Sequence, residues 1–146
     1  ETESRGVEID VFGKLTPAMN LIFNYAYNDV EITESTVEES VGSQLANAPQ
    51  HAGNIWAKYH FGNTDPSGLS AAIGLSARSE LLAGDDTPLP AYTLVNSALY
   101  YTWGNTELSL NWQNMFNERY DPGATNQYYL QPGLPSNVML RVSTSF

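Results

Sequence analysis

The side chains best suited to contact a ligand lie in two polar segments of the chain. Gln127, Tyr128 and Tyr129 are consecutive, and adjacent tyrosines offer flat apolar area with a hydrogen-bonding tip at low entropy cost. Asp85 and Asp86 form a second, acidic segment beside a glycine, and neighbouring carboxylates attract cations. These five residues are the candidate ligand contacts. The alternative is that the tyrosines only pack a loop and that the two acids are only solvated.

The sequence contains few residues that could catalyse a reaction. Cysteine is absent, which removes thiol nucleophiles, disulfides and Cys-type zinc sites together. The two histidines, His51 and His60, belong to no Gly-x-Ser-x-Gly, metal-ligand or phosphate-loop motif. We therefore predict a protein that is not an enzyme, with no cofactor and no metal of its own. A Ser/His/Asp site is the catalytic alternative.

The charge balance limits the possible partners. Acids outnumber bases 16 to 6, and the net charge of -10 argues against a nucleic-acid partner, because phosphate binding needs an excess of Lys and Arg. The acidity fits either general solubility or acidic loops that face a cationic medium or ligand. The chain begins Glu1-Thr2-Glu3, without the basic and apolar regions of a signal peptide, so we expect a mature chain or a fragment.

Apolar and polar residues alternate with a period of two along much of the chain, and no helical period is sustained. This pattern predicts seven β-strands, each about the length (roughly 9–11 residues) that a tilted membrane strand needs. The predicted strands cover residues 5–15, 20–32, 52–61, 69–80, 91–103, 106–117 and 137–146. No apolar run reaches the roughly 18 residues of a transmembrane helix, so we predict none.

The connections between the predicted strands alternate in length. Short turns are expected at 16–19, 62–68 and 104–105, long loops at 34–50 and 121–135, and a connection of intermediate length at 82–90. Because strands joined by tight turns are antiparallel, the short turns fall at one rim of the sheet and the long loops at the other. This asymmetry is typical of outer-membrane β-barrels.

The two faces of the predicted strands differ in chemistry. One face carries aliphatic residues with aromatic residues toward the strand ends, and the other carries Asn, Ser, Gln, Lys, Arg and Glu. Since Tyr and Trp rings favour the lipid–water interface, we interpret the apolar face as lipid-facing. The expected interface aromatics are Tyr27, Tyr59, Phe61, Tyr101, Trp103, Trp112 and Phe116. The alternative is a soluble β-sandwich or barrel with its apolar face inward.

Five motifs in a consistent order and spacing extend this interpretation. They are Ser4–Asp10 followed by Asn24–Tyr27, Ala48–His51 followed by Trp56–Tyr59, Leu89–Asn96, Asn114–Tyr120, and Pro132–Pro135 before a strand that ends at Phe146. Together they resemble the late barrel strands of TonB-dependent siderophore receptors, over essentially the whole chain. Asn114–Tyr120 is similar to that family's N-L-F-(N/D)-x-x-Y segment. One departure is Ser136, where the family commonly has Arg.

The resemblance implies an all-β fold. The chain would be an antiparallel transmembrane β-barrel segment, made of about seven C-terminal strands of a barrel of about 22 strands. Residues 1–146 would then be the C-terminal part of the receptor barrel, without the plug domain and the earlier strands. Seven strands alone would leave two unpaired edges, which lipid does not tolerate. The implied location is the outer membrane of a Gram-negative bacterium.

The resemblance also implies a function in uptake. A ferric siderophore is the expected transported ligand, and this segment would supply barrel wall, extracellular loops and the C-terminal assembly strand. Further expected partners are outer-membrane lipid and lipopolysaccharide, the β-barrel assembly machinery, and TonB through the missing N-terminal part. The residues that resemble the family's assembly signal are Val138, Leu140, Val142 and Phe146.

Two alternatives to this function stay open. The first is a TonB-dependent transporter of another ligand, such as cobalamin, haem or a saccharide. The second is a soluble β-sandwich binding module, which would fold in buffer without detergent.

Overall fold

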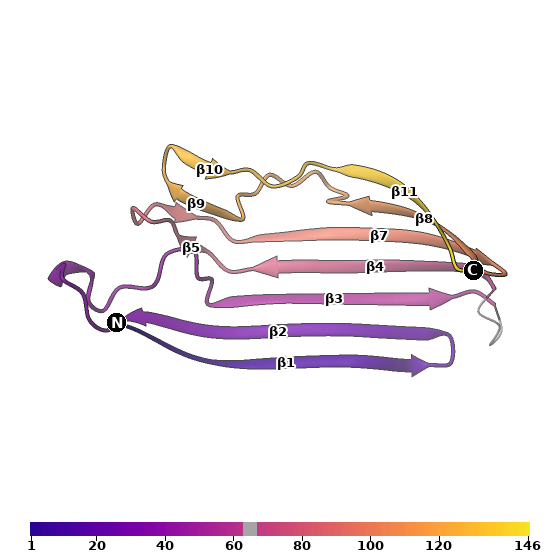
Figure 1. Cartoon of the computed structure of the whole chain (residues 1–146), viewed down its shortest axis with the longest axis horizontal. Helices are drawn as coiled ribbons and strands as arrows, with labels where there is room; N and C mark the ends of the chain where they lie inside the picture. Colours follow the sequence, from indigo (N-terminus) through magenta and orange to yellow (C-terminus); the bar gives the residue numbers. More distant parts are fainter. Residues whose placement is uncertain (63–66) are drawn as a thin grey trace.

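The computed structural model describes residues 1–62 and 67–146, which form a seven-stranded antiparallel sheet and two small hairpins (Figure 1). In spatial order the sheet contains β1 (Thr2–Thr16), β2 (Met19–Ile32), β3 (His51–His60), β4 (Gly68–Arg78), β7 (Tyr92–Trp103), β8 (Thr106–Gln113) and β11 (Asn137–Thr144). The hairpins are β5 (Leu81–Leu82) with β6 (Pro88–Leu89), and β9 (Gly123–Asn126) with β10 (Tyr129–Gln131). A single 3-10 turn, η1 (Glu38–Ser40), completes the described elements.

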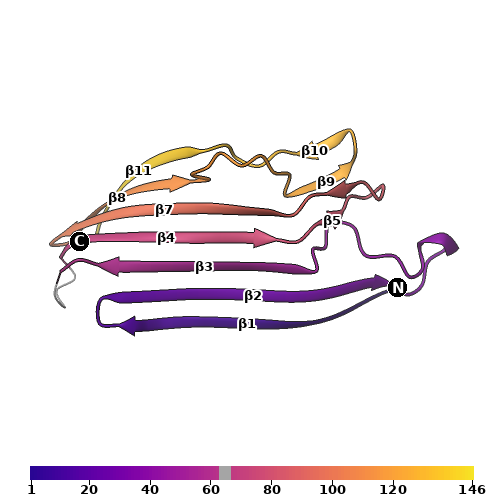
Figure 2. The ribbon, with the colours of Figure 1, turned by 180° about the vertical axis from the view of Figure 1, so that it is seen from behind.

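Two kinds of connection lie at opposite ends of the sheet (Figures 1 and 2). The turns after β1 and β7 contain only two residues each, and Gly104 in the second turn has a φ of 55°. The three long connections, residues 33–50, 79–91 and 114–136, lie together at the other end, here called the loop end. The predicted turn at 62–68 includes residues 63–66, which lie outside the described residues. For the connections that are described, the predicted asymmetry is confirmed.

The observed strands match the predicted ones within a few residues, and the largest difference is at the end of the sixth. β8 ends at Gln113 rather than at residue 117, because Asn114 and Asn117 have φ values of 48° and 53°. This left-handed conformation is incompatible with an extended strand. β11 likewise ends at Thr144 rather than at residue 146.

The sheet register places the predicted apolar residues on one face, here called the membrane face. Phe23 pairs with Ile55, and Ile55 pairs with Leu75, so each aliphatic or aromatic residue neighbours another. Ile73 and Leu140, although central in their strands, are 57% and 64% exposed. No second layer of the described chain covers this face, so an inward-facing sandwich core is not formed. An uncovered apolar face is what a lipid-facing barrel wall requires.

The opposite face of the sheet, here called the inner face, is polar. Asn24 Nδ2 donates to Asp10 Oδ1 at 2.7 Å across β1 and β2. Farther along the same face, Lys58 Nζ lies 4.0 Å from Glu107 Oε2 and 3.9 Å from the centre of the Tyr100 ring. The described part of the chain contains no helix long and apolar enough to cross a membrane.

Aromatic residues of the membrane face gather at the short-turn end of the sheet. The ring centres of Tyr59 and Phe61 lie 5.1 Å apart, with an edge-on angle of 74°. Those of Tyr101 and Trp103 lie 5.8 Å apart. These four rings form one band, as in the aromatic girdle of an outer-membrane barrel.

The loop end carries a second band of aromatic residues on the same face. There the Tyr27 ring centre lies 5.1 Å from the His51 ring. Trp112, whose Nε1 donates to Ser136 Oγ at 2.9 Å, is also on this face but pairs with Ser97, which pairs with Ile73 in the middle of β4. Phe116 differs from the prediction, which placed it inside a strand. It lies in the turn after β8 and is 77% exposed, because the strand has already ended at the left-handed Asn114.

Candidate ligand site at the loop end

The three long connections pack around a small apolar cluster of Leu81, Ala83, Leu89 and Ala124, all buried. Leu81 and Leu89 pair across the β5–β6 hairpin, while Ala124 comes from β9 in the next connection. A Cβ added at Gly84 would lie 2.7 Å from the Thr125 carbonyl oxygen, so the two connections approach closely there. The connections therefore form one packed body rather than separate loops.

Asn47 ties the first connection to the other two. Its Nδ2 donates to the Ala124 carbonyl and its Oδ1 accepts from the Ala124 N–H, both at 3.0 Å. Its backbone N–H donates to the Leu82 carbonyl at 2.7 Å. Asn47 has a φ of 59°, a conformation that asparagine tolerates better than most residues.

Asp85 joins the two segments that contain the predicted ligand contacts. Its Oδ2 accepts a hydrogen bond from the backbone N–H of Gln127 at 3.0 Å, and its Oδ1 accepts one from the Thr87 N–H at 3.3 Å. These bonds, first of all the one from Gln127, hold the pKa of the Asp85 carboxyl below its ordinary value. Asp86 instead shapes the hairpin turn, with a φ of 61° and a backbone bond to Ala83.

The tip between β9 and β10 presents the two predicted tyrosines to solvent. Asn126 Oδ1 accepts the backbone N–H groups of Tyr128 and Tyr129 at 2.9 and 3.1 Å, which fixes the turn. Tyr128 is 82% exposed and Tyr129 71% exposed. Their rings therefore do not pack the loop onto the rim, and they are free to contact another molecule.

A column of side chains anchors the last connection to the inner face. The Arg78 guanidinium lies 4.7 Å above the Tyr92 ring and donates to the Asp121 carbonyl. The Tyr92 ring centre is 4.5 Å from that of Tyr120. Tyr120 in turn covers Gly133, where a Cβ would overlap the phenol ring. The predicted motifs 114–120 and 132–135 are thus two halves of one packed anchor.

Asn114 is the residue at which the chain turns into this anchor, and it is buried, with 3% of its surface exposed. Its Nδ2 donates to the carbonyls of Glu118 and Leu134, at 2.8 and 3.0 Å, and its Oδ1 accepts the Glu118 N–H at 2.8 Å. Its backbone N–H donates to Asn96 Oδ1 on the neighbouring strand at 2.9 Å. The motif 114–120 therefore has a structural role, because it turns the chain inward at the end of β8.

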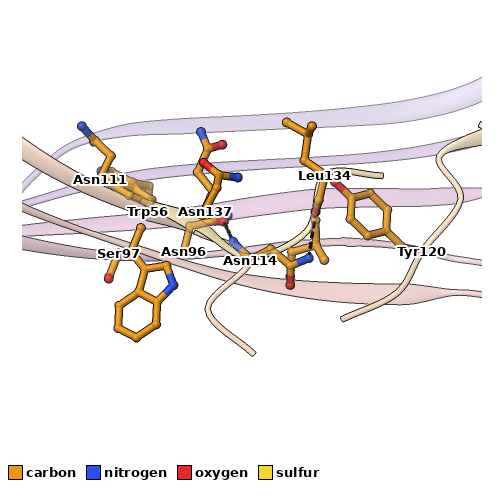
Figure 3. Close-up of a pocket in the computed structure, with 11 residues that line it drawn as sticks. Trp56, Asn96, Ser97, Asn111, Asn114, Tyr120, Leu134 and Asn137 are labelled. Carbon is orange, nitrogen blue, oxygen red and sulfur yellow. Dashed lines mark hydrogen bonds between the residues drawn. The ribbon is translucent and has the colours of Figure 1, made fainter. Parts of the chain in front are cut away.

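A pocket of about 290 Å³ opens on the inner face beside this anchor (Figure 3). Trp56 forms part of its wall, and its indole covers Gly74, where no larger residue would fit. The remaining lining residues are Leu94, Asn96, Ser97, Asn111, Trp112, Gln113, Asn114, Tyr120, Leu134 and Asn137. None of them is charged at neutral pH, so the pocket offers an indole, a phenol and several amides. Such a lining suits an uncharged, hydrogen-bonding group.

The sequence identified some of these residues and missed others. The structure brings Asp85 and Gln127 into contact and leaves Tyr128 and Tyr129 at the exposed tip. Residues that contact a ligand must be accessible, and these two tyrosines are. The pocket was not predicted, although the inner-face amides of β7 and β8 were visible as the polar half of the alternation. The described residues hold no group of three or more His, Asp and Glu side chains suited to a metal.

The predicted assembly residues lie on the last strand. Val138, Leu140 and Val142 occupy the membrane face of β11, opposite Trp112, Leu110 and Leu108. Phe146 follows the strand end and is fully exposed. Along its other edge β11 has no partner among the described strands.

Known proteins resemble this chain along its whole length. It is 32% and 33% identical to the metal-pseudopaline receptor CntO from two strains of Pseudomonas aeruginosa, over 100% of this chain and 21% of the receptor. It is 27% identical to the ferrichrome outer membrane transporter/phage receptor of Escherichia coli K12, over 88% of this chain and 18% of that protein. The chain thus spans about a fifth of the length of the curated relatives it matches. These relatives are receptors and transporters rather than enzymes, in agreement with the prediction.

Solved structures share the fold. The ferric-catecholate import receptor Fiu from E. coli K12, in its closed form, matches 99% of this chain and 21% of its own with a TM-score of 0.83 at 22% identity. The family described as "TonB dependent receptor-like, beta-barrel" matches residues 1–115. The predicted all-β, antiparallel transmembrane fold and the outer-membrane location are thereby confirmed, and the chain belongs to the TonB-dependent receptor β-barrel family.

Proposed function

We propose that this chain is part of an outer-membrane receptor that takes up a ferric siderophore, and that its loop end contacts the ligand. Relatives named as receptors for ferrichrome and ferrioxamine B support the ligand class. The observation in this chain that carries the proposal is the pair of exposed tyrosines, Tyr128 and Tyr129, on a tip held by Asp85 and Asn126. These bonds fix the backbone of the tip, and a tyrosine side chain has only two rotatable bonds, so binding costs these residues little conformational entropy.

The amide-rich pocket on the inner face offers a second contact surface for the same ligand. A siderophore carries amides, hydroxyls and aromatic or aliphatic linkers around its metal, and these groups match the indole, phenol and amides of Trp56, Tyr120 and Gln113. In this proposal the tyrosine tip contacts the ligand first and the pocket receives an uncharged part of it. The segment itself needs no cofactor for this function.

The full receptor is the material for the test. Its binding of ferric hydroxamates and ferric catecholates would be followed by intrinsic fluorescence, with the metal-free chelators as controls. The double variant Tyr128→Ala, Tyr129→Ala should weaken binding about tenfold or more, since aromatic anchors carry much of the energy of an interface. Tyr128→Phe should retain most of the affinity. If no ferric chelate binds the unaltered receptor, the proposed function is wrong.

A second candidate ligand is a metal complex other than a ferric siderophore. The relatives at 32% and 33% identity are named metal-pseudopaline receptors, which favours this variant of the same function. Loading the same chelators with different metals in the binding experiment would separate the two. A receptor that prefers a complex without iron would support the second candidate.

The remaining partners are also part of this proposal. TonB would act through the receptor region outside these 146 residues. The assembly machinery would pair with the free edge of β11, which ends near the exposed Phe146. Phe146→Ala should then lower the amount of receptor in the outer membrane without changing the ligand affinity of the molecules that reach it.

A further inference from the structure

A shallow apolar groove of about 330 Å³ interrupts the membrane face near the loop end. Its walls are formed mainly by membrane-face residues of β2, β3 and β4: Phe23, Tyr25, Ile55, Leu75 and Ala77. His51 and Ser79 lie at its loop end. The groove belongs to the outward surface of the barrel and is separate from the inner-face pocket.

The groove exists because two small residues are paired where large ones surround them. Tyr25 pairs with Gly53, and Gly53 pairs with Ala77, so the middle of this cross-strand row has almost no side chain. The adjacent row on the same face contains Phe23, Ile55 and Leu75 and forms one wall.

Polar groups close the groove at the loop end. The Tyr25 hydroxyl and His51 Nδ1 share a hydrogen bond of 2.8 Å, and the backbone N–H of His51 donates to Ser79 Oγ at 3.2 Å. The Tyr27 ring packs 5.1 Å from the imidazole. This end coincides with the aromatic band of the loop rim, the level at which hydrocarbon gives way to headgroups.

The groove presents no fixed charge. Arg78 is among its lining residues, but its guanidinium lies over Tyr92 on the inner face and bonds to the carbonyls of Ser79 and Asp121. Along the apolar walls a hydrated peptide or an ion would therefore lose water without gaining a hydrogen-bonding partner. A molecule with an apolar chain and a polar head fits the groove, because its chain matches the apolar walls and its head matches the polar groups at the loop end.

We propose that the groove holds one acyl chain of a lipopolysaccharide molecule of the outer leaflet, with the lipid's polar linkage beside Tyr25 and His51. Three observations carry this assignment: the groove is continuous with the lipid-facing surface, its walls are apolar, and its polar end is at the rim of the long loops, which are extracellular in outer-membrane barrels. The proposal depends on the barrel orientation and not on which ligand the receptor transports.

The test fills the groove in the full receptor. Ala77→Phe should fill it, while Ala71→Phe, on the same strand and face but near the short-turn end, is the matched control. Lipid that stays bound after detergent extraction would be identified by native mass spectrometry. Each methylene group of a lipid chain that can no longer enter an apolar site lowers the affinity about fourfold. Ala77→Phe should therefore reduce the retained lipopolysaccharide on the order of tenfold or more. Ala71→Phe should leave the retained amount unchanged.

A second measurement does not depend on the folding of the filled variant. A photoreactive p-benzoylphenylalanine at Leu75, in the groove wall, should form an adduct with the mass of lipopolysaccharide in intact outer membranes. The same residue at Ile73 should react several-fold less with it. Adducts with phospholipid only, or with a second copy of the receptor, would overturn the proposal, as would equal retention by the Ala77→Phe and Ala71→Phe receptors.

Discussion

The Asp85 carboxylate accepts the backbone N–H of Gln127 at 3.0 Å, a contact between two loops separated by 42 positions in the chain. The β5–β6 hairpin thereby holds the tip that carries Tyr128 and Tyr129. Asn126 fixes the turn from within, and Asp85 fixes it from the neighbouring loop. The presentation of the tyrosines thus depends on a residue outside their own loop.

Asp85→Asn should loosen the tip without unfolding the barrel. A neutral amide oxygen accepts a hydrogen bond less strongly than a carboxylate does. Hydrogen exchange at the Gln127 amide should become faster, while exchange in the centre of β4 stays the same. Asp86→Asn is the control, because it removes the same charge one position away and asparagine tolerates the φ of 61° there. Equal effects of the two variants would point to charge alone.

The same contact predicts a pH dependence. The pKa of Asp85 is lowered in the folded protein, so its stabilising contribution is complete above the ordinary carboxyl value of 3.8 and is lost as the pH falls through the lowered pKa. Protection of the Gln127 amide should therefore be constant from neutral pH down to that value and decline only under stronger acid. A decline near pH 6 would assign the effect to another group.

Gly133→Ala should destabilise the anchor of the last loop. Its new methyl group would overlap the Tyr120 ring, and overpacking of this kind costs about 1–3 kcal/mol. Gly13→Ala is the matched control, since nothing lies within 4 Å of a Cβ there. Urea unfolding of the full receptor in lipid vesicles gives both free energies. Combining Gly133→Ala with Tyr120→Ala should cost less than the sum of the single changes.

Asn114→Ala should cost more than Asn111→Ala, although both residues line the inner-face pocket. The first change removes three side-chain hydrogen bonds, those with the Glu118 N–H and with the carbonyls of Glu118 and Leu134, and each such bond contributes about 0.5–1.5 kcal/mol. It also places alanine at a φ of 48°. Among residues 1–62 and 67–146, the Asn111 side chain makes one hydrogen bond, which its Nδ2 donates to Ser109 Oγ at 3.2 Å. Equal unfolding free energies for the two variants would contradict the role of Asn114 in stabilising the turn after β8.

A lysine scan distinguishes the two faces of the sheet. Ile73→Lys, in the middle of β4 on the membrane face, should destabilise the receptor in vesicles by about 2–4 kcal/mol. Asn54→Lys, central in β3 on the polar inner face, should have little effect. The same unfolding measurement checks both. A reversed order would mean that the apolar face does not contact lipid.

The sheet could be predicted because its determinants are local. Alternation in segments such as 20–32 and 69–80 fixes which residues share a face, and a one-residue error in register would place Asn54 or Lys58 in lipid. Turn residues such as Gly104 mark the strand ends. These features need no knowledge of distant contacts.

The loop end was less predictable because distant side chains fix its structure. Nothing near Asn47 in the sequence indicates that it pairs with Ala124, 77 positions later. The end of β8 was misplaced for a similar reason. Phe116 is in phase with Leu110 and Trp112, although Asn114 interrupts this apolar row. The hydrogen bonds of Asn114 to Glu118 and Leu134 stabilise a left-handed turn there instead of a longer strand. The inner-face pocket depends on the second of these arrangements, since Asn114 and Leu134 line it.

The shared interior of the three long loops restricts how such a receptor can diversify. Leu81, Leu89 and Ala124 come from two loops, and Asn47 from the third binds the same Ala124. A single loop transplanted from another receptor would meet surfaces shaped for a different neighbour. Exchange of specificity between members of this family should therefore succeed when the loops move as a set, while the exposed tip at Tyr128 and Tyr129 can change alone.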